Sequence, residues 1–336
     1  MNEVTIQKIE KQFLCTFEEV WNNVLLSYRC NQDQLIQGSR LRPLMVLWGY
    51  LSTFDDLSLA DMEYIANVAV SVELLHKASI MLDDWIDEDD ARHGKNAFHV
   101  ESGPYFTVIL SLHMVSDAIL RLKNYLPSDT SLSNSYYHGA DIIAQTIYSM
   151  SKGALEELRL EKNIFDLEHI KMIAQLETAE IIGNAMQLGY LAGNGKTSSI
   201  SNMFKYLGDR FGYLFQAMND LEVFADPKRL IAHKGNSNYD IVISRKNLGV
   251  AMLYSVANQA DRESIIQRDP KKLHELILNY KIIDLVVMEA ELFCKIIPEK
   301  LQGFPTSDLS QEWVDGYLKF IARMKQKALD KLGLEQ

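Results

Sequence analysis

The stretch from Val70 to Asp90 decides the fold, and it reads VSVELLHKASIMLDDWIDEDD. Its first part is long and apolar, which is typical of a helix that is mostly buried. It ends in six carboxylates within eight positions, from Asp83 to Asp90. Carboxylates at the C-terminal end of a helix face the negative end of the helix dipole, and this costs stability. We therefore expect a positive charge close to these side chains.

A divalent cation is the first candidate for that charge. Asp83 and Asp87 are four residues apart, so both side chains leave the same face of the helix. A few hard oxygen ligands that leave coordination positions open suit Mg²⁺ shared with a phosphate group. A solvated acidic helix end without any ligand is the plainer alternative. The unfavourable dipole and the apolar residues before the acids favour the metal.

A second acidic patch follows the same pattern. Residues 211–226 form an apolar helical segment that collects acids at its end and stops before Pro227. Asn219, Asp220 and Glu222 supply the oxygen atoms there. Two such helix ends facing each other across a cavity would hold metal ions between them, and the ions would neutralise the charge on a departing diphosphate. The rest of the cavity must be dry and apolar, which the core of a helical bundle provides.

Composition limits the class of protein. The 336 residues are 47% hydrophobic, which is enough to bury a large core. The formal net charge of −11 argues against a nucleic-acid partner, because such a partner requires a basic surface. Three widely spaced cysteines indicate reduced thiols. The N-terminus has no apolar signal core, and no uninterrupted apolar run reaches the length of about 18 residues that spans a membrane. We expect a cytoplasmic protein without a membrane span.

The periodicity of apolar residues predicts an all-α fold. Phe13, Phe17 and Trp21 recur at helical spacing, and the interval between Pro127 and Pro227 contains no proline. The alternation of apolar and polar residues that marks strands is absent. We therefore predict one domain over residues 1–336, a single large helical bundle with a central cavity.

The two acidic helices, in their order and separation, resemble those of the trans-isoprenyl diphosphate synthases, the polyprenyl synthetase family. Residues 83–87 match the first aspartate-rich motif, residues 92–94 stand where the family has Arg-Arg-Gly, and residues 219–222 stand at the second aspartate-rich motif. The resemblance runs from Gly38 to Lys246. It implies the isoprenoid-synthase fold, Mg²⁺ as cofactor with three ions in the site, an allylic isoprenyl diphosphate as substrate, and a homodimer.

The resemblance also implies the residues of the site. The catalytic carboxylates are Asp83, Asp84, Asp87 and Asp220. The metal ligands are Asp83, Asp87, Asn219, Asp220 and Glu222. The substrate-binding residues are Arg42, His76, Arg92, Thr178, Gln216, Arg245 and Lys246.

The chain departs from the family where the second substrate binds. The family holds isopentenyl diphosphate with a lysine and a second arginine, and Ser39 and His93 stand at those positions here. A charge-assisted hydrogen bond is worth about 1.5–3 kcal/mol, so losing two would weaken binding on the order of 10²–10⁴-fold. Protonated His93, Arg40 or Lys95 could replace part of this charge.

These departures lead to a prediction and to its alternatives. The prediction is an Mg²⁺-dependent prenyltransferase that passes a prenyl group to an acceptor other than isopentenyl diphosphate, for example a peptide tryptophan or an indole. One alternative is a class I terpene synthase, whose metal triad would fall on Asn219, Val223 and Pro227, although the last two cannot ligate a metal through their side chains. The others are a chain-elongating, geranylgeranyl-type synthase and a non-catalytic subunit.

The floor of the pocket is expected five and four residues before the first aspartate. Ala78 and Ser79 occupy these positions, and both are small, so a long tail could pass them. We therefore expect a C15 or C20 allylic diphosphate to be accepted over a C10 one. Small residues that serve only the packing of crossing helices are the alternative.

Overall fold

The structure is a computed structural model, and it describes residues 3–30, 32–53, 57–92, 94–125, 133–160, 165–194, 198–225, 247–302 and 310–331. The helices in the first half are α1 (Glu3–Tyr28), α2 (Asp33–Ile36), α3 (Leu41–Leu51), α4 (Leu59–Ile86), α5 (Phe98–Ser102), α6 (Pro104–Tyr125) and α7 (Ser133–Arg159). Those in the second half are α8 (Leu167–Ala174), the π-helix η1 (Gln175–Ala179), α9 (Glu180–Asn194), α10 (Ser199–Ala225), α13 (Leu248–Val256), α14 (Gln259–Ile266), α15 (Pro270–Asn279), α16 (Ile282–Gln302) and α17 (Gln311–Lys331).

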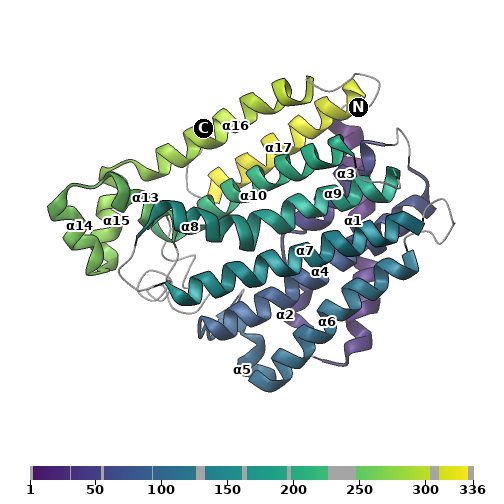
Figure 1. The fold of residues 1–336 in the computed structure, drawn as a ribbon, viewed down its shortest axis with the longest axis horizontal. Helices are drawn as coiled ribbons and strands as arrows, with labels where there is room; N and C mark the ends of the chain where they lie inside the picture. The colour runs from purple at the N-terminus through teal and green to yellow at the C-terminus, as the bar shows by residue number, and fades with distance from the viewer. Residues whose placement is uncertain are drawn as a thin grey trace.

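The all-α prediction is confirmed. Within the described ranges, the strands are β1 (Ala91–Arg92) and β2 (Lys95–Asn96), which pair antiparallel in a short hairpin. In Figure 1, α16 and α17 lie along the upper edge, α5 and α6 along the lower edge, and α14 and α15 at the left end. That residues 1–336 form one domain remains a prediction.

Aromatic residues join the two ends of the chain in the core. The predicted stripe of Phe13, Phe17 and Trp21 on α1 is fully buried. The indole of Trp313 on α17 donates to the carbonyl oxygen of Trp48 at 3.0 Å and packs edge-on against the Trp48 ring. Trp48 Nε1 also donates to Glu10 Oε1 on α1 at 3.0 Å, so the first and last described helices both contact α3.

The central helices pack with their backbones almost in contact. A Cβ added at Gly208 of α10 would lie 2.6 Å from the Cα of Gly183 on α9. A Cβ added at Gly49 of α3 would lie 2.0 Å from the carbonyl oxygen of Met186 on α9. Only glycine fits these crossings, so three helices converge at small residues in the middle of the bundle.

Three helices run in the direction opposite to α9. The Tyr64 hydroxyl, near the start of α4, donates to the carbonyl oxygen of Ala192 near the end of α9. The contacts of α10 and α7 show the same antiparallel order, because residue numbers fall along η1 and α9 as they rise along the partner helix. For α10 the pairs are Gly183 with Gly208 and Thr178 with Gln216. For α7 they are Asn184 with Thr146 and Glu177 with Gly153. The C-terminal ends of α4, α7 and α10 therefore lie at the same end of the bundle, toward the left in Figure 1.

Two described helices have the length and apolar composition of a membrane span. They are Leu59–Ile86, in which 78% of the apolar window is buried in the bundle, and Pro104–Asn124, in which only 33% is buried. Sequence reasoning missed them because each apolar stretch contains polar interruptions. The first is a core helix, whereas α6 presents an exposed apolar face.

Candidate active site

The acidic run begins on α4 and turns sharply after it. The amide of Glu88 donates to the carbonyl oxygen of Trp85 at 3.3 Å, and the amide of Asp89 donates to that of Asp84 at 2.9 Å. This pair of bonds is the Schellman motif, which requires a left-handed residue just past the helix. Glu88 fills that position with φ of 57°, at a cost that glycine would not incur. The turn leaves Asp83 and Asp87 at the helix end and directs the chain into β1.

Asp84 is neutralised by an arginine of the same chain. Arg92 Nε donates to both carboxylate oxygens of Asp84 at 2.8 Å, and Nη2 lies 2.6 Å from Oδ1. Asp84 is only 1% exposed. Burial lowers the pKa of Arg92, but the charges on Asp84, Asp83 and Asp89 outweigh burial and raise this pKa above its ordinary value. The hairpin of β1 and β2 thus supplies a positive charge that the acidic helix end requires.

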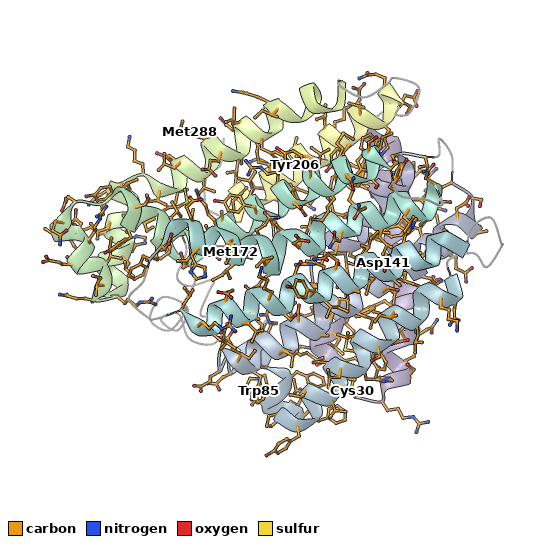
Figure 2. The ribbon with its side chains drawn as sticks, in the orientation of Figure 1. Cys30, Trp85, Asp141, Met172, Tyr206 and Met288 are labelled. Carbon is orange, nitrogen blue, oxygen red and sulfur yellow. The ribbon has the colours of Figure 1, made fainter. Side chains whose placement is uncertain are left out.

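The environments of Asp83 and Asp87 differ from that of Asp84. Asp83 is exposed and Asp87 is half-buried. Sequence reasoning grouped these three aspartates, and the structure separates them into an exposed Asp83, a half-buried Asp87 and a buried Asp84 that is paired with Arg92. Arg92, expected to bind substrate, is bound to Asp84. Trp85, which directly follows Asp84 in the sequence, is 40% exposed at the edge of the bundle (Figure 2).

A chain of hydrogen bonds organises the second acidic patch. The hydroxyl of Thr178 donates to Gln216 Oε1 at 2.9 Å, and Gln216 Nε2 donates to Asp220 Oδ1 at 2.7 Å. Thr178 lies in η1, a one-turn π-helix between α8 and α9, and such insertions are frequent at functional sites. The predicted residues Thr178, Gln216 and Asp220 are therefore brought together directly.

The start of α13 supports Asp220 from the other side. The amide of Leu248 donates to Asp220 Oδ2 at 2.7 Å, and Asn247 Nδ2 donates to the Asp220 carbonyl oxygen at 3.1 Å. The positive end of the α13 dipole thus stabilises a carboxylate that faces the negative end of its own helix. This contact had no signal in the sequence. Arg245 and Lys246, predicted to bind substrate, lie outside the described residues, as does His93.

The donor atoms at the two helix ends suit Mg²⁺. Both patches offer hard oxygen atoms, and Asn219, Asp220 and Glu222 are half-buried. Among the residues that the structure describes, no group of three or more His, Cys, Asp or Glu side chains is close enough to form a metal site alone. A magnesium ion that shares the oxygens of a diphosphate needs only one or two protein carboxylates, so this arrangement fits a metal that binds together with its substrate.

Arg42 on α3 and His76 on α4 form a polar pair that is separate from the acidic patches. Arg42 Nη1 lies 2.9 Å from His76 Nε2. Burial, together with the charges of Arg42 and Lys77, holds the pKa of His76 well below its ordinary value. His76 is therefore neutral, and its Nε2 accepts from Arg42, since a guanidinium can only donate. Arg42 is 9% exposed and its Nε has no hydrogen-bond partner. This buried donor could therefore bind an anionic acceptor.

Two of the three replacements proposed for the missing family cations, Arg40 and Lys95, are engaged in ion pairs. Arg40 donates to Glu18 at 2.7 Å and to Glu73 at 2.8 Å, and its guanidinium stacks on the Phe17 ring. Lys95 pairs with Asp33 at 2.6 Å on the surface. Arg40 still contributes positive charge near His76, whereas Lys95 is paired at the surface.

Lys77 is the residue of this region that sequence reasoning missed. Its ammonium donates to the Gln37 carbonyl oxygen and lies 3.9 Å from Glu73 Oε1. Burial is the main cause that lowers the Lys77 pKa to about 8, and Arg40, Arg92 and Arg42 lower it further. A lysine directly after His76 in an otherwise apolar helix was the available signal.

The predicted pocket-floor residues lie one turn above the acids. Ala78 is 1% exposed, and Ser79 is half-buried with its hydroxyl donating to the His76 carbonyl oxygen at 2.8 Å. Ser79 is thus satisfied within its own helix, and both positions are compatible with a floor of small residues. Their role in tail length remains a prediction.

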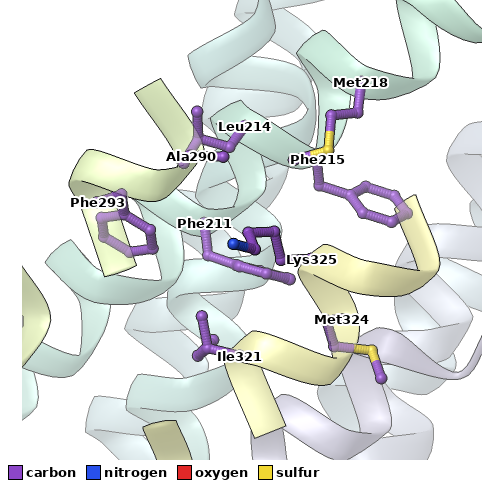
Figure 3. Close-up of a pocket in the computed structure, with 9 residues that line it drawn as sticks. All are labelled: Phe211, Leu214, Phe215, Met218, Ala290, Phe293, Ile321, Met324 and Lys325. Carbon is purple, nitrogen blue, oxygen red and sulfur yellow. The ribbon is translucent and has the colours of Figure 1, made fainter. Parts of the chain in front are cut away.

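Two concavities among the described residues lie on a different face of α10 from Gln216 and Asp220. A small pocket is bounded by apolar side chains of α10, α16 and α17, with Lys325 beside them (Figure 3). An open groove runs between α8, α10 and α16, past Met172 and Tyr206. Since Phe211, Leu214 and Met218 are on the opposite side of α10 from Gln216 and Asp220, the pocket is separate from the acidic patches.

The sequence matches one family model over most of its length. The model of the Polyprenyl synthetase family covers residues 26–282. Heptaprenyl diphosphate synthase component 2 of Geobacillus stearothermophilus is 24% identical over 237 residues, 70% of this chain and 68% of that protein. Geranylgeranyl diphosphate synthase of Saccharolobus solfataricus is 24% identical over 306 residues, 86% of this chain and 87% of that protein. The chain belongs to the polyprenyl synthetase family.

Solved structures share the fold. Polyprenyl synthase from Caulobacter crescentus, complexed with calcium and isoprenyl diphosphate, has a TM-score of 0.75 at 18% identity, over 95% of this chain and 96% of that one. Geranylgeranyl pyrophosphate synthetase from Pyrococcus horikoshii has a TM-score of 0.74 at 21% identity, over 95% and 97%. The predicted isoprenoid-synthase fold is confirmed.

The relatives change the order of the functional hypotheses. The family indicates an enzyme of isoprenoid biosynthesis that acts on isoprenyl diphosphates, and the prediction of a prenyltransferase is confirmed at this level. The named relatives are diphosphate synthases, including a geranylfarnesyl diphosphate synthase of Aeropyrum pernix. The first prediction, an acceptor other than isopentenyl diphosphate, is not supported, and the chain-elongating alternative fits better. In the terpene-synthase alternative, the side chain of Val223 and all of Pro227 lie outside what the structure describes.

Proposed function

We propose that this protein is an Mg²⁺-dependent, chain-elongating isoprenyl diphosphate synthase that joins an allylic diphosphate to isopentenyl diphosphate. The buried, incompletely bonded Arg42 beside neutral His76 carries this proposal. A synthase of this kind needs a second anion site that is separate from the carboxylates. Arg42 and His76 offer one without any carboxylate in direct contact with the guanidinium among the described residues.

The metal-binding side of the site holds the allylic diphosphate. The ligands that we propose for Mg²⁺ are Asp83 near the end of α4, Asp87 just after it, and Asn219, Asp220 and Glu222 on α10. Bound Mg²⁺ supplies Lewis-acid neutralisation of the diphosphate charge. Thr178 and Gln216 orient Asp220, and Arg92 keeps Asp84 paired. Three ions remain an expectation from the family.

The reaction requires binding, orientation and exclusion of water. The carbon–oxygen bond of the allylic diphosphate breaks, its first carbon bonds to the terminal alkene carbon of isopentenyl diphosphate, and a proton leaves the adduct. Arg42 and His76 hold the acceptor diphosphate, which fixes the alkene near the reacting carbon. The packed helices around Ala78 exclude water from the tail and from the cationic carbon.

Product analysis tests this function. Purified protein with Mg²⁺ is incubated with C10, C15 or C20 allylic diphosphate, with and without isopentenyl diphosphate. We expect elongated diphosphates only when isopentenyl diphosphate is present, with C15 or C20 preferred over C10. Cyclic hydrocarbons would support the terpene synthase instead. Slow hydrolysis without elongation would support a different acceptor, such as a peptide tryptophan or an indole.

We also propose that a second copy of the chain covers the exposed face of α6, forming a homodimer in the cytoplasm. Tyr105, Ile109, Leu112 and Leu120 recur at helical spacing on this face, and their exposed fractions are 89%, 65%, 59% and 59%. Light scattering should give a dimer for the native chain and a monomer for Leu112→Glu. An unchanged dimer in the variant contradicts this interface, and binding of the native chain to lipid vesicles would assign the face to a membrane instead.

A further inference from the structure

We infer that Lys77 is a binding residue for the diphosphate of the second substrate, and that it supplies from α4 the positive charge that Ser39 does not provide. This inference rests on the proposed function, because it assigns a residue to its acceptor site. Lys77 is adjacent in sequence to His76, whose ring contacts Arg42. With Lys77, the proposed acceptor site has three polar side chains: Arg42, His76 and Lys77.

The position of the Lys77 ammonium points to an anion site. Lys77 is 3% exposed, but its Nζ lies next to Gly38, which is itself exposed. A Cβ added at Gly38 would lie 3.3 Å from Nζ. Gly38 has φ of 143° and no side chain, so this exposed residue places no side chain over the ammonium.

The charges around Lys77 leave a positive excess. Glu18 pairs with Arg40, and Glu73 is divided between Arg40 and Lys77. Arg42 makes no ion pair among the described residues and feels the charge of Glu73 only at longer range, so three cations face two carboxylates. Arg92, whose charge also acts on Lys77, is paired with Asp84. Unpaired buried charge is costly, so a bound dianion would be stabilised here.

The lowered pKa of Lys77 agrees with this reading. Burial and the surrounding cations reduce it to about 8, so the side chain is largely protonated at neutral pH but poorly compensated. A diphosphate would supply the missing negative charge and raise the pKa again. The hydrogen bond to the Gln37 carbonyl oxygen is weak compensation for a full charge, and it holds Nζ at the turn.

Binding without metal isolates this site. The carboxylate side of the active site requires Mg²⁺ to bind a diphosphate, whereas a site made of Arg42, His76 and Lys77 does not. Isopentenyl diphosphate is therefore titrated calorimetrically into the full chain in the presence of EDTA. We expect binding to the native chain, and binding weakened on the order of 10- to 100-fold in Lys77→Met.

Two further variants control this comparison. Lys77→Arg, which keeps the charge, should stay within a few-fold of the native chain, and Lys95→Met, which removes a surface lysine paired with Asp33, should bind like it. Above pH 8 the native chain should lose affinity while Lys77→Arg retains it, a difference that a purely structural role would not produce. Lys77→Gln replaces the methionine variant if the latter does not fold.

Two outcomes overturn the inference. They are native-like affinity of a folded Lys77→Met or Lys77→Gln, and absence of any metal-independent binding to the native chain. The proposed function fails separately, if the native chain binds isopentenyl diphosphate through Lys77 but yields no elongated product with any allylic diphosphate.

Discussion

Asp84 and Asp83 are neighbours in sequence, yet Asp84 is 1% exposed and joined to Arg92 at 2.6 Å, whereas Asp83 is exposed. The same substitution should therefore act differently at the two positions. Asp84→Asn leaves the buried Arg92 without its carboxylate, and we expect a loss of roughly 3–5 kcal/mol in the free energy of unfolding. Asp83→Asn should change that free energy by less than about 0.5 kcal/mol and abolish Mg²⁺-dependent turnover.

Urea unfolding and product assays on both variants check this difference. If both lose stability equally, the structural separation of the two aspartates is wrong. If Asp83→Asn keeps full turnover, Asp83 is not a metal ligand.

Thr178 acts on Asp220 through Gln216. Thr178→Val keeps the shape of the side chain but removes the donor to Gln216 Oε1, so the amide can rotate away from Asp220. We expect turnover to fall about 5- to 10-fold, as the loss of one oriented hydrogen bond of about 1 kcal/mol predicts. Thr178→Ser, which retains the hydroxyl, is the matched control. Equal activity of the valine and serine variants would contradict the hydrogen-bond chain.

Gly208 tests the close approach of α9 and α10. Replacing glycine by alanine inside an exposed helix normally stabilises it by about 1 kcal/mol. Here the added Cβ would meet the Gly183 Cα at 2.6 Å, so Gly208→Ala should lower the free energy of unfolding by roughly 1–3 kcal/mol. It should also reduce turnover, since the crossing sets the distance from Thr178 to Gln216. Thermal unfolding measures the first effect, and an increase in melting temperature would refute the packing.

Lys77→Met should stabilise the fold while it weakens binding. Lys77 titrates near pH 8 when folded and near 10.5 when unfolded, so the unfolded state binds more protons between these values. The free energy of unfolding of the native chain therefore gains a contribution that rises with pH across this window. Burial is the largest cause of this lowered pKa, and Glu73, Arg40, Arg92 and Arg42 are the charged groups that act on it.

Lys77→Met has no ammonium at this position, so its free energy of unfolding lacks the pH-dependent contribution of Lys77. We expect Lys77→Met to be more stable than the native chain by roughly 1–3 kcal/mol at pH 7, with the gap closing toward pH 10. Chemical unfolding at both pH values measures it. A gap that is independent of pH would show that the ammonium is not buried and charged as described.

Ala78→Phe should shorten the accepted tail. Ala78 is buried on α4 one turn before the acids, and a phenyl ring there would fill the space that a tail needs. We expect the preferred allylic substrate to shift from C15 or C20 toward C10. Chromatography of the products measures the shift, and Ser79→Ala serves as a control of unchanged length. An unaltered product distribution would remove Ala78 from the pocket floor.

The sequence was sufficient for local structure and for the chemistry of the two helix ends. The apolar periodicity around Trp21 and the long stretch before Asp83 predicted buried helices, and the structure contains them. The oxygen-rich ends of α4 and α10 were also visible, since acids that follow an apolar helix stand out in the sequence. Short helices and the hairpin of β1 and β2 were not predicted, because a few residues carry too little periodic signal.

The sequence by itself determined the all-α class, the family and the oxygen ligands at two helix ends. These follow from residue type and spacing along one helix, which local geometry fixes. Only the tertiary structure decided which aspartate pairs with Arg92, that the start of α13 donates to Asp220, and that the Lys77 ammonium lies beside Gly38. The physical reason is that the partner of a charge is set by distances between segments far apart in the chain, and those distances exist only once the helices have packed.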